Sequence, residues 1–157
     1  MLIRKIEEVD YQDVYQLVKY ELGYQNLEFN KFCWRLDQML QDTNYQIYVA
    51  IIDYRVVGII GLMLGWGLEI EGKIMRIIAL AVEHRYQGQK IGSSLIAYSE
   101  QYALSKQVSA ITVNSGLERR RAHEFYKKND YYKKGYSFIK KCEQVVNKVL
   151  IVLEFHL

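Results

Sequence analysis

Apolar and polar residues follow two different periods along this chain, and the periods divide it into predicted helices and strands. Apolar positions at helical spacing predict a helix that Asp10 can cap, that runs to about Leu22, and that Gly23 is placed to end. Apolar residues at i, i+3, i+4 and i+7 predict a second helix over Phe29–Leu40. Two amphipathic helices are therefore expected in the first quarter of the chain.

Shorter segments are apolar throughout or alternate with polar residues, and these predict strands. Met1–Ile6 reads as an edge strand, and Tyr45–Ile52 and Val56–Trp66 form a predicted hairpin around the turn Asp53–Arg55. Ile74–Val82 is apolar on both faces and is expected at the centre of a sheet. The remaining predicted strands are Ser109–Val113, Tyr132–Lys141 and Lys148–Phe155.

The order of these elements defines a fold class. Two further helices are predicted over Gln89–Ser105 and Leu117–Lys128. Because the first of these joins Ile74–Val82 to Ser109–Val113, we expect those two strands to be parallel. The order β, α, α, β, β, β, α, β, α, β, β predicts a mixed sheet of about seven strands with four helices on its faces, of the α/β (α+β) class. No linker interrupts it, so residues 1–157 are expected to form a single domain.

Composition limits the classes of ligand, metal site and cellular location that the sequence allows. The chain has 157 residues, of which 50% are hydrophobic and 25% charged, and its net charge of +3 suits an anionic ligand but is too small to argue for nucleic acid. Its cysteines, Cys33 and Cys142, form no metal or redox motif, and its histidines have no ligand spacing, so no metal is expected. Without a signal peptide or a bilayer-length apolar run, we expect a cytoplasmic protein that is not held in a membrane.

The segment from Val82 to Ser93 has the pattern of a phosphate site. It joins the apolar strand to a helix through a loop with glycines at 88 and 92, which places free backbone N–H groups at a helix N-terminus. Lys90 and Arg85 add positive charge nearby. The spacing is neither that of the nucleotide P-loop nor that of the dinucleotide fingerprint. Taken alone, the segment is equally an ordinary strand-to-helix connection.

Two motifs together resemble one family. The run from Gln87 to Gly92 is similar to the acyl-CoA pyrophosphate loop of the GCN5-related N-acetyltransferases (GNAT family), [Arg/Gln]-x-x-Gly-x-[Gly/Ala], although Lys90 replaces its middle glycine. Asn114, then Ala122-His123-Glu124-Phe125-Tyr126 and Tyr131, resemble the family's Asn…Ala-x-x-Phe-Tyr…Gly-Phe signature, with Asp130 in place of the glycine. The predicted strand order agrees, so the resemblance covers the whole chain.

The resemblance implies acetyl-CoA as cofactor. Its pyrophosphate would rest on the loop, its thioester carbonyl would face backbone donors at the splayed end of the central strand, and its pantetheine arm would enter the gap beside that strand. Asn114 would bond the pantetheine amide or cap the next helix, and the basic helix Arg119–Lys128 would reach the 3′-phosphate or simply face solvent. The implied cofactor-binding residues are Leu80, Ala81, Val82, Gln87, Gly88, Gln89, Lys90, Ile91, Gly92, Ser93, Asn114, Arg121 and Phe125.

The resemblance also assigns chemistry. Tyr126 matches the tyrosine that lies near the cofactor sulfur, so it is the expected general acid for the leaving thiolate, or else a packing residue. An ammonium acceptor must lose a proton before it attacks, and Glu69 and Glu71, before the central strand, are the candidate bases. Glu83, after the strand, is a third. All three are equally well explained as solvated loop charges.

These features predict an N-acetyltransferase that moves an acetyl group to a primary amine by direct attack. The expected acceptor is a small amine of the aminoglycoside or polyamine kind, and a protein or peptide amine is the alternative. The apolar stripe of the second helix is expected in the core, and its exposed side, Tyr24–Arg35, could line an acceptor groove. A non-catalytic acyl-CoA-binding regulator and a nucleic-acid-binding module using the lysine pairs are alternatives of other classes. The apolar segment Val149–Phe155 either pairs in a homodimer or lies within the sheet.

Overall fold

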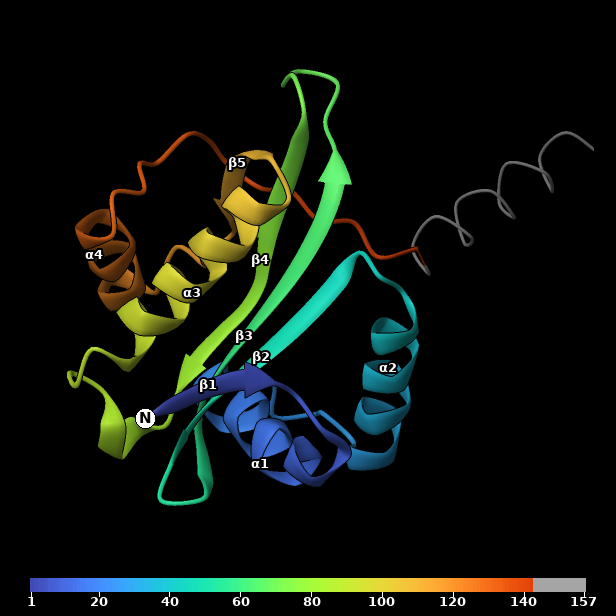
Figure 1. Cartoon of the computed structure of the whole chain (residues 1–157), viewed down its shortest axis with the longest axis vertical. Helices are drawn as coiled ribbons and strands as arrows, with labels where there is room; N and C mark the ends of the chain where they lie inside the picture. Colours follow the sequence, from blue (N-terminus) through green and yellow to red (C-terminus); the bar gives the residue numbers. More distant parts are fainter. Residues whose placement is uncertain (143–157) are drawn as a thin grey trace, which may run out of the picture.

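The computed structural model describes residues 1–142. Figure 1 shows an open sheet with helices on both faces. In chain order the elements are β1 (Leu2–Lys5), η1 (Glu8–Asp10), α1 (Tyr11–Gln16), η2 (Leu17–Glu21), α2 (Phe29–Gln41), β2 (Tyr45–Ile52), β3 (Arg55–Trp66), β4 (Lys73–Val82), η3 (His84–Tyr86), α3 (Ile91–Ser105), β5 (Val108–Val113) and α4 (Arg120–Lys128).

The sheet has the mixed topology that the sequence predicts. Its strands lie in the order β1-β2-β3-β4-β5, antiparallel except for the parallel pair β4–β5. The crossover through α3 is what allows that parallel pair, since a short turn cannot return the chain in the same direction. The α/β (α+β) class is confirmed, and the structure shows five strands within residues 1–142 where about seven were predicted for the whole chain.

The strand predicted over Tyr132–Lys141 is wrong. That segment carries no regular secondary structure, and Phe138 and Ile139 are 94% and 93% exposed. Its alternating pattern could form a strand only beside a partner that buries one face, and no neighbouring strand lies there within residues 1–142. The strand predicted over Lys148–Phe155, with its role in a homodimer, lies outside the described residues.

Two hydrophobic cores lie on opposite faces of the sheet. One core packs α1, η2 and α2 against the sheet, with Val14, Phe32 and Val49 among its buried members. The other packs α3, and the inner side of α4, against the opposite face through Leu95, Ile96 and their neighbours. Figure 1 shows α3 and α4 on one side and α1 and α2 on the other. The sheet is therefore apolar on both faces, which explains the continuous apolar runs of β3 and β4.

Strand β4 changes register in its middle. The pairing with β3 shifts between Gly61 and Leu62, whose partners are Ala79 and Ile77, so Ile78 has no partner on β3. Before the shift, Met75 and Ile77 point into the α3 core, whereas after it Leu80 and Val82 face that core and Ala81 enters the α1–α2 core. A β-bulge of this kind bends a strand and increases its twist.

Two of the three glycines in β3 allow another part of the chain to approach closely. A Cβ on Gly58 would lie 3.1 Å from Leu95 Cδ1 of α3, and one on Gly61 would lie 3.1 Å from Ile78 Cγ1 beside the bulge. Gly65 has nothing within 4 Å of such a Cβ. Gly58 and Gly61 therefore let α3 and the bulge come close to β3, and Gly65 has no such role.

The first helix is not a regular α-helix throughout. After α1 the chain continues without a break into η2, a π-helical segment over Leu17–Glu21. Gly23 follows with φ +83°, as a helix-ending glycine does. None of the helices within residues 1–142 is both long and apolar enough to cross a bilayer.

Candidate active site

The second half of β4 presents an unpaired backbone edge. Its pairing with β5 runs from Lys73 opposite Val108 to Ile77 opposite Val113, where β5 ends. From Ala79 to Val82, β4 keeps β3 on one side but has no strand on the other within the described residues. The bulge at Ile78 lies where the two parallel strands separate. The N–H and C=O groups of this half-strand, including Leu80, Ala81 and Val82, are thus available to an extended ligand.

The loop that follows β4 ends in glycine-like backbone. Gly88 has φ +80°, and Lys90, at the position where the family has glycine, has φ 63° and ψ 6°, which is left-handed. Lys90 is also the N-cap of α3 and makes no side-chain bond to the first turn. The backbone N–H groups of Ile91, Gly92 and Ser93 therefore begin α3 without a side-chain cap, as an anion site at a helix N-terminus requires.

Side-chain hydrogen bonds fix the loop to the strand before it. Gln87 Nε2 donates to Val82 O at 3.0 Å, and Gln89 Nε2 donates to Arg85 O at 3.3 Å. Arg85 pairs with the carboxylate of Glu83. Gln87 and Gln89 thus hold the loop, and Arg85, predicted as a source of free positive charge, is already neutralised by Glu83.

Helix α4 comes close to the N-terminus of α3 at one glycine. A Cβ on Gly92 would lie 3.2 Å from both Cε2 and Cζ of Phe125 and 3.8 Å from Val82 Cγ2. Three predicted site residues therefore meet at a single point: Val82 at the end of β4, Gly92 in α3 and Phe125 in α4. Gly92 is required here by close packing, since its φ is not among the positive ones.

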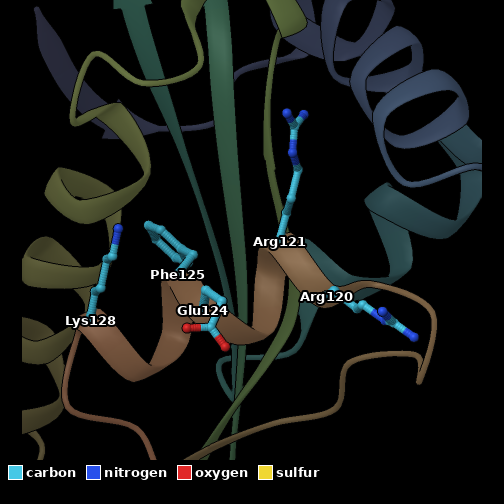
Figure 2. Close-up of a pocket in the computed structure, with 5 residues that line it drawn as sticks. All are labelled: Arg120, Arg121, Glu124, Phe125 and Lys128. Atoms are coloured by element: carbon cyan, nitrogen blue, oxygen red, sulfur yellow. The ribbon is translucent and has the colours of Figure 1, made fainter.

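A cationic groove opens beside this contact. Its volume is 420 Å³, and it is lined by Arg120, Arg121, Glu124, Phe125 and Lys128. In Figure 2, Arg121 and Lys128 rise on either side of the Phe125 ring, and Arg120 points away from them. Glu124 is bonded to Lys127 at 2.9 Å, which lowers the pKa of its carboxyl. The groove therefore keeps an excess of positive charge around an apolar floor.

Tyr126 lies half-buried among other aromatic rings. Its centroid is 5.4 Å from that of Phe125 and 5.7 Å from that of Tyr131, and the backbone N–H of Tyr131 donates to its carbonyl at 3.0 Å. Burial raises the pKa of Tyr126, and the charge of Arg119 opposes that rise. The phenol is therefore protonated at neutral pH, as a proton donor must be.

The turn after α4 contains another non-glycine residue with a left-handed backbone, as Lys90 has. Asp130 stands where the family signature has glycine, and it also adopts a left-handed backbone, with φ 64°. Asn129 Nδ2 donates to Phe125 O at 2.8 Å and helps to end the helix. Both departures from the family pattern thus keep the glycine conformation.

Asn114 does not cap α4. It is exposed and donates to Ser137 Oγ at 3.1 Å, whereas α4 begins six residues later with Arg119 as its N-cap. The helix therefore starts later than the predicted Leu117, and the turn before it is fixed by His123 Nε2, which lies 2.9 Å from Gly116 O. Asn114 thus remains the candidate for a bond to pantetheine, and no metal-ligating group of three or more side chains occurs within residues 1–142.

The candidate bases are not brought to this site. Glu69 and Glu71 are exposed in the loop between β3 and β4, at the opposite end of β4 from the Gln87–Gly92 loop. Figure 1 shows this hairpin projecting beyond the helices. The ten residues of β4 that separate the two loops span about 33 Å in extended conformation. A role for either carboxylate as the base stays a prediction.

Sequence reasoning missed Glu21, Ser115 and the hydroxyl of Tyr131. Glu21 Oε1 accepts the backbone N–H of His84 at 2.9 Å, and Glu21 Oε2 accepts Gln87 Nε2 at 3.3 Å. Within residues 1–142, Ser115 Oγ and Tyr131 Oη are buried and have no hydrogen-bond partner. A signal for Glu21 was present: it follows Val14 by seven residues and so stands on the apolar stripe of a regular helix, where a carboxylate is unexpected.

The chain belongs to the acetyltransferase (GNAT) family. Residues 3–131 match that family's model. An aminoalkylphosphonate N-acetyltransferase from Salmonella typhimurium is 31% identical over 131 residues, which is 83% of this chain and 84% of the relative. The protein is accordingly an acyltransferase, and the family predicted from the loop and the Phe125-Tyr126 motif is confirmed.

Solved structures share the fold. A transcriptional regulator from Bacillus halodurans has a TM-score of 0.84 at 18% identity, with 89% of this chain and 98% of that chain covered. An aminoglycoside acetyltransferase from an uncultured soil metagenomic sample, in complex with sisomicin, has a TM-score of 0.75 at 21% identity, with 89% and 95% covered. At these identities the likeness establishes the architecture alone.

Proposed function

We propose that the protein transfers an acetyl group from acetyl-CoA to a primary amine. The observation that carries this proposal is the meeting of the unpaired half of β4, the loop with its uncapped α3 N-terminus, and the cationic groove of α4. Acetyl-CoA is an extended thioester with phosphates at one end. Its pantetheine arm matches the β4 edge, its pyrophosphate the α3 N-terminus, and its 3′-phosphate the cationic groove. The close contact of Gly92 with Phe125 and Val82 supports it further, since any side chain at residue 92 would push on a groove wall.

Each part of the site has a chemical task in this reaction. The backbone of β4 beyond Ile78 can form strand-like hydrogen bonds with a pantetheine amide and direct an N–H at the thioester oxygen. The N–H groups of Ile91, Gly92 and Ser93 suit a pyrophosphate. Acetyl-CoA supplies the acetyl group and a thiolate leaving group. The unpartnered Ser115 Oγ, just beyond β5, is a further polar group that such a ligand could satisfy.

Tyr126 is the proposed proton donor to the leaving thiolate. Direct attack forms a C–N bond, breaks the C–S bond and leaves the sulfur with the electron pair, so a proton must reach the sulfur and another must leave the nitrogen. Tyr126 remains protonated because burial raises its pKa. The proton from the amine leaves by way of solvent or a carboxylate.

The proposed acceptor is a small amine that also carries an anionic group. The curated relative acts on an aminoalkylphosphonate, according to its name. The nearby acids Glu83 and Glu124 are already paired with Arg85 and Lys127, so neither is free to attract a polycation. This counts against the aminoglycoside and polyamine acceptors that the sequence suggested.

Two measurements test the proposal. Thermal unfolding with acetyl-CoA should show a raised midpoint, because a ligand that binds only the folded state stabilises it by mass action. Release of the coenzyme A thiol should then be followed with 2-aminoethylphosphonate, ethylamine, spermidine, an aminoglycoside and a peptide amine. We expect kcat/KM for the aminophosphonate to exceed that for ethylamine, the same amine without the anion, at least tenfold.

The outcomes separate the parts of the proposal. A higher kcat/KM for spermidine or the aminoglycoside would overturn the anionic acceptor and restore the polycationic one. Preference for the peptide would indicate a protein acceptor. Acetyl-CoA binding without thiol release for any amine would indicate a non-catalytic acyl-CoA-binding protein, and an unchanged midpoint at saturating acetyl-CoA would overturn the transferase assignment.

A further inference from the structure

Glu21 ends a π-helical segment beside the cofactor loop. The segment η2 follows α1 directly, and its extra residue per turn rotates what comes after it around the helix axis. Glu21 would otherwise share a face with Val14, which is fully buried. The π-turn therefore moves a carboxylate from the hydrophobic core toward the loop, and Glu21 is half-buried there. Single π-helical turns of this kind are rare and occur frequently at functional sites.

Three parts of the site converge on this one residue. The carboxylate accepts His84 N–H at 2.9 Å and Gln87 Nε2 at 3.3 Å, and the backbone carbonyl accepts Nη2 of Arg119 at 3.4 Å. His84 begins the turn after β4, Gln87 opens the loop motif, and Arg119 is the N-cap of α4. These residues are 63 to 98 positions away in the sequence, so the contacts are tertiary.

The side-chain amide nitrogen of Gln87 uses both of its hydrogens in this arrangement. It donates to Val82 O at 3.0 Å and to Glu21 Oε2 at 3.3 Å, which accounts for both of its hydrogens. Val82 ends β4 and Glu21 ends η2, so Gln87 is fixed between two elements. The left-handed positions Gly88 and Lys90 follow at once. Fixing Gln87 therefore fixes the direction in which the loop enters α3.

The charge of Glu21 would otherwise be unfavourable here. A carboxylate near a site for a polyanion repels that ligand, so the residue lowers affinity unless its hydrogen bonds contribute more than its charge costs. Each of its oxygens accepts a hydrogen bond from a loop donor, so the carboxylate holds the loop at two points. We infer that Glu21 is a positioning residue that holds the loop from His84 to Lys90 in the conformation that receives the acetyl-CoA pyrophosphate. This inference rests on the proposed function.

The test compares three variants with wild type. Glu21→Ala removes both acceptors, Glu21→Gln keeps one oxygen for His84 N–H and removes the charge, and Glu28→Ala is the matched control. Glu28 lies on the segment leading into α2 and pairs only with Lys31 at the surface. The readouts are the Kd for acetyl-CoA by calorimetry, kcat, the KM for the acceptor, and hydrogen exchange of the His84 amide without ligand.

We expect Glu21→Ala to raise the Kd for acetyl-CoA about tenfold, as loss of hydrogen bonds to a charged acceptor would. The acceptor KM and kcat should stay within about twofold of wild type, and the His84 amide should exchange faster. Glu21→Gln should raise the Kd by only about threefold, since it retains one of the two acceptors. Glu28→Ala should match wild type in the Kd for acetyl-CoA and in the exchange of the His84 amide. Ligand-free unfolding midpoints separate these effects from a general loss of stability.

Several results would overturn the inference. A Kd for Glu21→Ala within twofold of wild type would do so, as would an equal rise for Glu28→Ala. A large fall in kcat for Glu21→Gln would identify Glu21 as a base instead. If Glu21→Ala does not fold, Gln87→Ala removes the other side of the same contact and should raise the Kd without changing kcat. Wild type that binds no acetyl-CoA would refute the proposed function itself, and that result is distinct from all the others.

Discussion

Replacing Gly92 by alanine should separate ligand binding from folding. The added Cβ would lie 3.2 Å from two Phe125 ring atoms, where carbon atoms prefer about 3.5 Å or more, so the ring must move by at least about 0.3 Å. Helix α4 has no buried residues, so it can shift, and the overpacking cost falls near the low end of about 1–3 kcal/mol. The better helix propensity of alanine returns up to about 1 kcal/mol. Without ligand, stability should therefore change by only about 1 kcal/mol.

Binding should suffer more than stability. The displaced Phe125 ring forms the apolar floor of the groove, and small misplacements in a binding site are expensive. We expect the Kd for acetyl-CoA to rise at least tenfold, which removes about 1.4 kcal/mol of ligand stabilisation. In thermal unfolding at saturating acetyl-CoA, this loss would reduce the ligand-induced rise of the midpoint by roughly 3–6 °C.

A control and a rescue make the experiment decisive. Gly65→Ala also adds a methyl group to a glycine, but no atom lies within 4 Å of its Cβ, so its ligand-induced shift should equal that of wild type. Adding Phe125→Leu to Gly92→Ala shortens the side chain in the way and should recover part of the shift. If Gly92→Ala keeps the full ligand-induced shift, acetyl-CoA does not bind beside Gly92 and the reasoning is refuted.

Two further predictions concern the tyrosine and the left-handed lysine. Tyr126→Phe should lower kcat about 10²-fold with the acetyl-CoA KM unchanged. In wild type, kcat should fall at high pH, as pH rises through the pKa of Tyr126, which burial raises above its usual value. Tyr131→Phe removes a buried hydroxyl that has no hydrogen-bond partner within residues 1–142, so it should leave kcat unchanged and hold or raise the unfolding midpoint. Equal losses of kcat in the two variants would contradict the acid role. Lys90→Gly relieves about 1–2 kcal/mol of strain in the left-handed backbone and costs about 0.5–1 kcal/mol in chain entropy, so the unfolding midpoint should rise slightly. The control Gln89→Gly should lower the midpoint. Equal falls of the midpoint in the two variants would show that Lys90 is not strained.

Local pattern was sufficient to predict most of the fold. The hairpin β2–β3, the central strand β4 and the helices appear where the apolar periods placed them, with ends that differ by up to three residues. These elements each bury a face against the sheet, so the period and the burial agree. Tyr132–Lys141 has the same alternation and no strand, because alternation supplies a face but not the neighbour that pairs with it.

The candidate site was predictable only in part, for physical reasons. The motif around Gly92 and Phe125 identified residues that do meet, since the family resemblance already contains tertiary information. Lys90 could be named as a departure, but its left-handed backbone depends on how the loop is held. Periodicity marks Glu21 only as a carboxylate on an apolar stripe; its contact with the loop could not be predicted, because a π-turn changes the helical period at this residue. The assignment of Glu69 and Glu71 relied on chain order, which does not measure distance.

The unpaired residue Ile78 divides β4 into two half-strands whose side chains alternate in opposite phase. Odd-numbered residues face α3 before it and even-numbered ones after it. Losing this one residue would make Ile77 and Ala79 adjacent, opposite Leu62 and Gly61, so Leu80, Ala81 and Val82 would keep their faces. The bulge would be lost, and with it the bend that separates β4 from β5. Loops usually absorb length changes during evolution. Here the length of a central strand is itself part of the site, so we expect substitutions of Ile78 among homologues but no deletion.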